Sequence, residues 1–136
     1  MNDLPNNYSE NIEEIINKSK IDFEMIKYSE TKRIGNEVYG YFNLLKSKKV
    51  GGIYVNINKK EGKIKFGEPI MMEDLNLKER LELNGLEEKI SKELDFITIK
   101  VEVPEEEIKK ELIKEGYLFE NKGHLGIKKL KWVQEK

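Results

Sequence analysis

The chain has 136 residues and is densely charged: 25 lysines and arginines stand against 26 aspartates and glutamates, and the formal net charge is -1. Because a general nucleic-acid binder normally carries a basic excess, this balance argues against nucleic acid as a partner. There is no cysteine and only one histidine, His124, which excludes disulfides, thiolate chemistry and paired-histidine metal sites, so we expect no bound metal.

The sequence carries no sign of a membrane segment. No apolar stretch approaches the roughly 18 residues of a membrane span, and the first residues lack the basic and then apolar pattern of a signal peptide. We therefore expect a cytoplasmic protein without membrane contact. The length suits one hydrophobic core, and no repeat or linker divides the chain, so residues 1–136 are predicted to form a single domain.

The first predicted elements are a helix and a strand. Residues Tyr8–Lys20 place Ile12, Ile15 and Ile16 on one helical face. In residues 21–30, apolar and polar side chains alternate, which is typical of a strand.

The clearest β pattern follows. Three apolar, β-prone runs lie near residues 38–45, 50–57 and 63–72, separated by the polar stretches KSKK and NKKEGK, which suit hairpin turns. They predict an antiparallel meander. Pro69 cannot donate a backbone hydrogen bond, so we expect it at a bulge or an unpaired position.

The stretch RLELNGLEEKI, residues 80–90, admits two interpretations. In the first, a loop ends at Gly85 and a helix begins there, with Asn84 as N-cap and Glu87 three residues later, as in a capping box. In the second, LNLKERLELNGLEEKI is one uninterrupted helix capped by Asp74, in which Gly85 costs about 1 kcal/mol relative to alanine. The sequence leaves both open.

A strand, a helix and a hairpin are predicted for the rest of the chain. The strand DFITIKVEV alternates, and one face carries Ile97, Ile99, Val101 and Val103. The helix PEEEIKKELIKEGY has glutamates at its positive end and Gly116 at its C-cap. The closing hairpin, YLFENKGHLGIKKLKW, turns near Gly123.

This second half resembles the GNAT acyltransferase superfamily. The similarity rests on the strand VGGIYV, the unit FITIKVEVPEEEIKKELIKEGY ending in Gly-Tyr, and the closing hairpin, and it runs from about Glu37 to the C-terminus. It implies a GNAT-like acyl-CoA N-acyltransferase fold: an α/β domain whose mixed, mostly antiparallel sheet is flanked by helices and splays apart in the middle. It also implies transfer of an acyl group from acetyl-CoA to an unknown small amine or protein amine.

The resemblance further implies a place for the cofactor. In that family acyl-CoA threads the splay, here between the strand ending at Met72 and the strand beginning near Phe96. The pyrophosphate sits on backbone N–H groups of an Arg/Gln-x-x-Gly-x-Gly/Ala loop that opens a helix, because glycine allows close approach and helix N-termini favour anions. Arg80 matches the first position and Gly85 the last, while Leu83 replaces the middle glycine. The implied cofactor-binding residues are Met71, Met72, Arg80, Leu83, Asn84, Gly85 and Leu86.

The usual catalytic acid of the family is not matched. The tyrosine that protonates the leaving thiolate corresponds here to Leu112, and an asparagine earlier in that helix corresponds to Glu105. Other side chains could take part in acid–base chemistry: Glu68, Glu73, Tyr117 and His124. For each of them, a solvated or packed structural role is the alternative.

The alternative function is that of a non-catalytic relative, a regulatory or immunity-type module that binds a protein. The missing middle glycine, the missing tyrosine, and Glu87 and Glu88, which would repel a pyrophosphate, favour this alternative. Arg80, Gly85 and the Gly-Tyr helix end favour the enzyme. Because KYSETKRIGNE leaves little room for helices after the first strand, an acceptor pocket could be open, rebuilt by the helix at residues 8–20, or completed by the second subunit of a homodimer.

Overall fold

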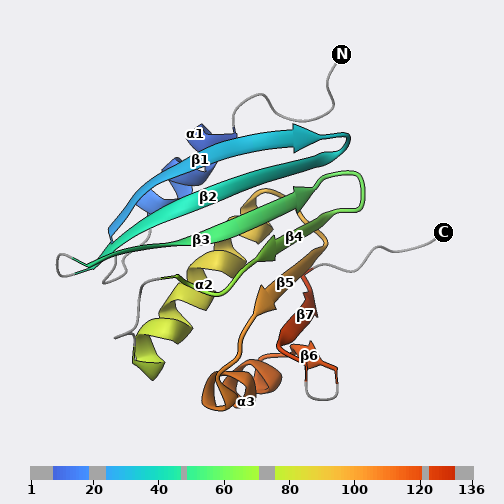
Figure 1. The fold of residues 1–136 in the computed structure, drawn as a ribbon. Helices are drawn as coiled ribbons and strands as arrows, with labels where there is room; N and C mark the ends of the chain where they lie inside the picture. The colour runs from blue at the N-terminus through green and yellow to red at the C-terminus, as the bar shows by residue number, and fades with distance from the viewer. Residues whose placement is uncertain (1–7, 19–23, 47–48, 71–75, 121–122, 131–136) are drawn as a thin grey trace.

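The computed structural model describes residues 8–18, 24–46, 49–70, 76–120 and 123–130. These residues form three helices and one seven-stranded sheet in the order β1-β2-β3-β4-β5-β7-β6 (Figure 1), which confirms the predicted α/β class and the predicted order of elements. The elements are α1 (Tyr8–Asn17), β1 (Glu24–Ile34), β2 (Glu37–Lys46), β3 (Lys49–Asn58), β4 (Lys63–Phe66), α2 (Leu77–Glu93), β5 (Thr98–Glu102), α3 (Glu106–Lys114), β6 (Leu118–Phe119) and β7 (Leu125–Lys129).

Strands β2 to β4 form the predicted antiparallel meander, and β1 extends it by pairing antiparallel with β2. Between β1 and β2 the chain turns through Gly35, whose φ of +60° is a conformation that glycine adopts readily. β4 ends at Phe66, earlier than predicted, and Ile70 then rejoins β3 through an isolated bridge to Gly52. Pro69 lies in the unpaired stretch between them, as expected of a residue without a backbone donor.

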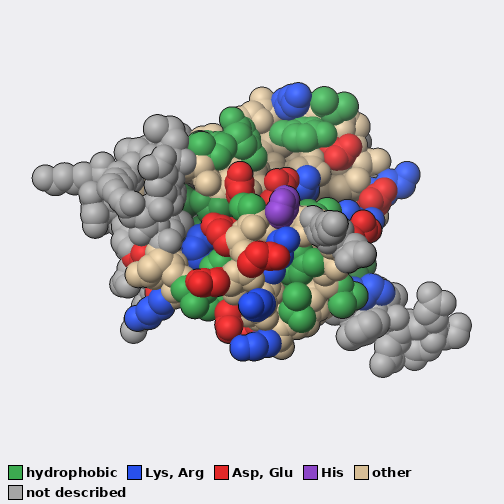
Figure 2. Space-filling view, turned by 60° about the horizontal axis from the view of Figure 1, so that its bottom comes forward, with side chains coloured by type: hydrophobic (Ala, Val, Ile, Leu, Met, Phe, Trp, Pro, Cys, Tyr) green, Lys and Arg blue, Asp and Glu red, His purple; other side chains and the backbone are tan. Residues whose placement is uncertain are grey.

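The C-terminal part supplies one parallel pair and an antiparallel hairpin. β5 pairs with β4 in parallel and with β7 antiparallel, and β6 completes the edge beside β7. α3 ends at Lys114 and its C-cap is Glu115, one residue before the predicted Gly116; Gly116 follows with a φ of +105°, the left-handed conformation that commonly ends a helix. His124 lies just before β7 with an exposed side chain, among acidic and basic side chains (Figure 2), and its carbonyl accepts a hydrogen bond from the Val103 N–H.

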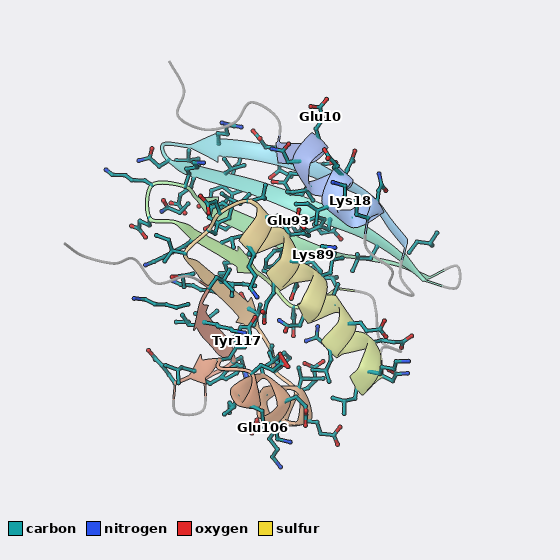
Figure 3. All side chains as sticks on the ribbon, turned by 180° about the vertical axis from the view of Figure 1, so that it is seen from behind. Glu10, Lys18, Lys89, Glu93, Glu106 and Tyr117 are labelled. Atoms are coloured by element: carbon teal, nitrogen blue, oxygen red, sulfur yellow. The ribbon has the colours of Figure 1, made fainter. Side chains whose placement is uncertain are left out.

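The two faces of the sheet differ in cover. α1 and α2 lie on one face, here called the inner face (Figure 3), and their apolar side chains join those of the strands in a single core. The largest fully buried side chains of that core are Ile12, Tyr28, Phe42, Leu44, Ile53, Ile57, Ile64, Phe66, Leu83, Ile90 and Tyr117. The opposite, outer face carries the alternate residues of the strands, among them Tyr39, Tyr54 and Lys65. Among the described residues, no helix is both long and apolar enough to cross a membrane.

Candidate functional site

The sheet parts between β4 and β5. The two strands pair over only four residue pairs, from Lys63 with Thr98 to Phe66 with Val101. Beyond that point each strand follows a different neighbour. Gly67 donates its N–H to the Tyr54 carbonyl of β3, whereas β5 continues along β7. On the outer side of the sheet, the parting borders a hollow at Gly67.

The stretch RLELNGLEEKI is helical throughout, so the second of the two interpretations is correct. α2 begins at Leu77 and runs without interruption to Glu93. Its N-cap is Asn76, so the predicted caps, Asp74 for the single helix and Asn84 for the shorter one, are both wrong. A capping box forms here: the Glu79 N–H donates to Asn76 Oδ1 at 2.8 Å, and the Asn76 N–H donates to Glu79 Oε1 at 3.0 Å.

The segment expected to form a cofactor-binding loop lies within α2. The residues from Arg80 to Leu86 lie within the helix, where Leu83 and Leu86 are buried in the core. Their backbone N–H groups therefore belong to the helix and do not open a loop toward an anion. Gly85 is exposed, and nothing lies within 4 Å of the place a Cβ would occupy.

Most of the remaining residues of the expected cofactor and acid–base sets follow β4 in the chain. Met71, Met72 and Glu73 lie outside the described residues. Glu68 is exposed and directly follows Gly67. Among the described residues, no group of three or more acidic or histidine side chains could hold a metal ion.

Arg80 joins the two helices that flank the parting. It is 8% exposed, and its Nη2 donates to Glu105 Oε1, just before α3, at 3.1 Å. Its Nε is buried without a hydrogen-bond partner among the described residues. The guanidinium is thus occupied by the protein's own carboxylate at the position where the resemblance placed a phosphate contact.

Four polar side chains form what we call the α2–β7 cluster: Asn84, Glu88, Tyr117 and Lys128. The Tyr117 hydroxyl donates to Glu88 Oε2 at 2.8 Å and accepts from Asn84 Nδ2 at 3.2 Å. Lys128 Nζ donates to Glu88 Oε1 at 3.2 Å and lies 5.4 Å from the centre of the Tyr117 ring. No local sequence pattern associates these residues, because Glu88 and Lys128, for example, are 40 positions apart.

The α2–β7 cluster favours a structural role for Tyr117 over proton transfer. Tyr117 is 1% exposed, and burial, together with the neighbouring Glu88 carboxylate, raises the pKa of its phenol far above the ordinary value. A phenol that holds its proton so tightly at neutral pH is a poor source of a proton for a thiolate. This geometry favours the packed structural role of Tyr117 over the catalytic one.

Glu87, beside the cluster, is a buried carboxyl group. It is 5% exposed, and burial raises its pKa from 4.5 to about 8, against the opposing effects of the Arg80 guanidinium and the Asn84 amide. Glu87 is therefore protonated at neutral pH. Sequence reasoning placed it in the first turn of a helix, as a charge facing an incoming phosphate, whereas it is a neutral group inside the domain.

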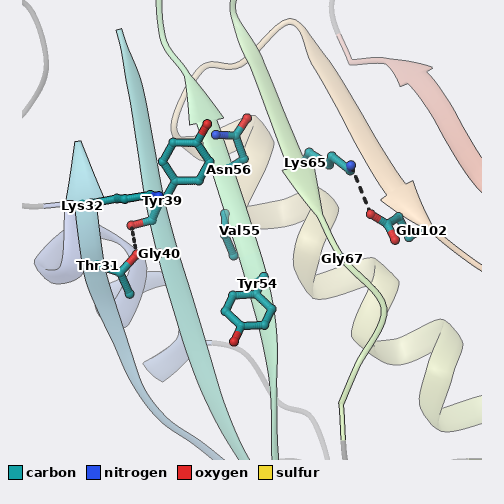
Figure 4. A pocket seen from close by; sticks show the side chains of 10 residues that line it. All are labelled: Thr31, Lys32, Tyr39, Gly40, Tyr54, Val55, Asn56, Lys65, Gly67 and Glu102. Carbon is teal, nitrogen blue, oxygen red and sulfur yellow. Dashed lines mark hydrogen bonds and ion pairs between the residues drawn. The ribbon is translucent and has the colours of Figure 1, made fainter. Parts of the chain in front are cut away.

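The outer face carries a hollow that we call the outer groove (Figure 4). It encloses about 330 Å³ and is lined by residues of the five strands β1 to β5 and by Gly67, chiefly Tyr39, Tyr54, Asn56, Lys65, Gly67 and Glu102. Lys65 Nζ pairs with Glu102 Oε1 at 3.1 Å. The Asn56 amide nitrogen is buried without a hydrogen-bond partner among the described residues. α1 packs on the inner face against β1 and α2, so it does not cover the groove.

Sequence reasoning missed the outer groove. The alternation in each strand shows which residues share a face, but the register between strands decides which of them become neighbours. Here Tyr39, Asn56 and Lys65 are direct cross-strand partners.

Comparison with protein-family models and with curated proteins found no match to this chain.

Proposed function

We propose that this domain is a non-catalytic relative of the GNAT acyltransferases that binds an acidic segment of another protein through the outer face of its sheet. The order of the elements supports the GNAT-like part of this proposal. A mixed, mostly antiparallel sheet parts between β4 and β5, and a strand, a helix and a hairpin follow, as the resemblance implies.

The start of α2 supports the proposal that the domain is non-catalytic. The connection from β4 to α2, GEPIMMEDLN at residues 67–76, contains one glycine, at its first position. The first turn of the helix is already capped by Asn76 and Glu79. A pyrophosphate would have to displace the Asn76 side chain and face the Glu79 carboxylate, which opposes the binding of an anion there.

The outer face of the sheet supports the proposal that the domain binds another protein. Tyrosine is enriched in protein interfaces, and this face carries three: Tyr39, Tyr41 and Tyr54, the last of which is 60% exposed. Lys32 and Lys100 lie on the same face and have no carboxylate partner among the described residues. Lys32 Nζ lies 5.1 Å from the centre of the Tyr39 ring. Cations without a carboxylate partner, beside tyrosines, complement an acidic partner segment.

The test begins with capture of partners from an extract of the source cells, with wild type and Tyr54→Glu as baits. A protein captured by wild type alone is then purified, and its Kd is measured with both. We expect Tyr54→Glu to weaken binding about tenfold or more, as loss of a central interface aromatic does. The matched control is Ile113→Glu on α3, which changes an equally exposed apolar residue away from the outer face.

Two results would contradict the proposal. One is a partner whose affinity depends on Ile113 and not on Tyr54. The other is a wild type whose only interaction is with a second copy of itself, measured by sedimentation, since the homodimer is then the function of this face.

The parting of β4 and β5 favours a second candidate, an acyl-CoA-dependent N-acyltransferase acting on a small amine or a protein amine. The outer groove reaches the parting at Gly67 and Glu102. An amine in the groove would thus lie beside a thioester threaded between the strands. In this function acetyl-CoA is the cofactor, and Glu102 in the groove, or the exposed Glu68 after Gly67, is the candidate carboxylate to accept a proton.

A thermal melt separates the two candidates. Acetyl-CoA or CoA at about 1 mM, binding with a Kd a hundredfold lower, adds about 2.7 kcal/mol and raises the Tm by several degrees. A rise that Lys78→Glu in the first turn of α2 abolishes, and that the later substitution Lys89→Glu leaves intact, would favour the acyltransferase. No rise with either ligand would leave the binding module as the account of this domain.

A further inference from the structure

The outer groove lies in a row of cross-strand neighbours. The register places Lys32 of β1 beside Tyr39 of β2, then Asn56 of β3, Lys65 of β4 and Lys100 of β5. Neighbouring strands are about 4.8 Å apart, so the row spans roughly 20 Å across the sheet. The row offers three ammonium groups and one amide; the carboxylate that lines the groove, Glu102, lies outside this row and pairs with Lys65.

The groove is open because Gly67, in the neighbouring row of cross-strand residues with Tyr41 and Tyr54, has no side chain. Tyr41 and Tyr54 pack edge to face, with ring centres 4.8 Å apart, and Gly67, just after β4, lies next to Tyr54. A larger residue in place of Gly67 would lie over the floor of the groove. The volume of about 330 Å³ is at the lower end of the range for small-ligand sites, which suits one anchoring side chain.

Asn56 supplies the groove with a hydrogen-bond donor that is free among the described residues. Its amide nitrogen is buried and makes no hydrogen bond to the described residues, and such a donor gains most from an incoming acceptor. The Asn56 amide lies beside the Tyr39 ring, and Lys65 extends toward Glu102 (Figure 4). The Lys65 ammonium has three donors, so it can bind a second carboxylate while it keeps the Glu102 contact.

We propose that the outer groove is a carboxylate-binding site, which seats a glutamate side chain of the partner segment between the Asn56 amide and the Lys65 ammonium. The methylene groups of that glutamate lie against the rings of Tyr39 and Tyr54. Lys32 and Lys100, at the two ends of the row, attract the flanking acidic residues. The inference rests on the proposed function, because it names the group by which an acidic partner is recognised.

The test uses a short fluorescein-labelled oligo-glutamate peptide and the full chain, with Kd measured by fluorescence anisotropy. We expect wild type to bind the peptide, and Asn56→Leu and Lys65→Gln each to raise the Kd about tenfold, since each removes a hydrogen bond to a charged group. Lys63→Gln is the matched control: it makes the same charge change two positions along β4, outside the groove. We expect it to change the Kd less than about twofold.

A second variant blocks the groove without removing a polar group. At Gly67, a Cβ would lie 3.7 Å from the Tyr54 carbonyl oxygen and 3.9 Å from Tyr54 Cβ, which is ordinary contact. Gly67→Leu should therefore fold, as checked by circular dichroism and melting, and abolish peptide binding by filling the groove.

Three outcomes would overturn the inference. Equal losses in Lys63→Gln and Lys65→Gln would mean that the face attracts anions without a site. Tighter binding of an oligodeoxythymidylate of equal charge would mean that the face binds single-stranded nucleic acid. Failure of oligo-glutamate to bind, while the captured partner still depends on Tyr54, would end this inference and leave the proposed function standing.

Discussion

Tyr117 shows how a buried polar residue can be mistaken for a catalytic one. Its hydroxyl links Glu88 and Asn84 of α2 to the chain segment after α3, and Lys128 of β7 completes the group. The sequence places it at the end of a helix, where an aromatic side chain can pack or act. The hydrogen bonds that decide between these roles join residues about 30 positions apart, which no local pattern reveals.

Substitution of Tyr117 by phenylalanine tests the structural role. The ring stays, but Asn84 Nδ2 and Glu88 Oε2 each lose a buried partner, so we expect a loss of about 1–3 kcal/mol in the free energy of unfolding, measured in urea. Tyr54→Phe is the control, because Tyr54 is 60% exposed and should change stability by less than about 0.5 kcal/mol. Equal stability of the two variants would refute the role assigned to the cluster.

Glu87 makes stability depend on pH. Its pKa is about 8 in the folded domain and 4.5 ordinarily, so the folded state holds the proton more tightly. The stability that comes from this group is therefore complete below about pH 4.5 and is lost as the pH rises toward 8. We expect the free energy of unfolding to fall by up to about 1.4 kcal/mol per pH unit in that window.

The measurement is urea unfolding at a series of pH values. Glu87→Gln should flatten the profile, because glutamine is neutral throughout, while Arg80, Glu88 and Lys128 remain around the site. The exposed Glu93, later in the same helix, supplies the control: Glu93→Gln should keep the wild-type slope. A wild type whose stability does not change between pH 5 and pH 8 would contradict the buried, protonated state of Glu87.

At the scale of elements, α2 decides between the two interpretations of the chain. Two capping patterns stand eight positions apart, Asn76-x-x-Glu79 and Asn84-x-x-Glu87, and both satisfy the local rule for a helix start. The earlier one forms because the longer helix buries Leu83 and Leu86 on the same core as Ile90. That choice depends on packing against the sheet, so it could not be made from the sequence.

Gly85→Ala tests the uninterrupted helix directly. Gly85 is exposed within α2 and has open space where a Cβ would lie, so alanine should raise the free energy of unfolding by about 1 kcal/mol. At Gly116, where φ is +105°, the same substitution should destabilise the domain. A loss of stability in Gly85→Ala would mean that the helix is broken at this position.

At the scale of the whole molecule, the sequence predicted the class, the meander and the order of elements. Those features follow from local alternation and helical spacing, as at Ile99, Val101 and Val103, all of which are buried. The candidate site was predicted less well. The outer groove depends on register, which brings Tyr39 next to Asn56, and the α2–β7 cluster depends on long-range packing.

The short parallel pairing of β4 and β5 also has a mechanical consequence. The strands of the meander are hairpin neighbours, whereas the β5–β7 part joins them through four residue pairs, the common core and the polar contacts of Arg80 and Glu88. These polar contacts reinforce the junction between the meander and the β5–β7 part. Loosening them should turn one cooperative unfolding transition into two, with amide hydrogens of the β5–β7 part exchanging before those of the meander.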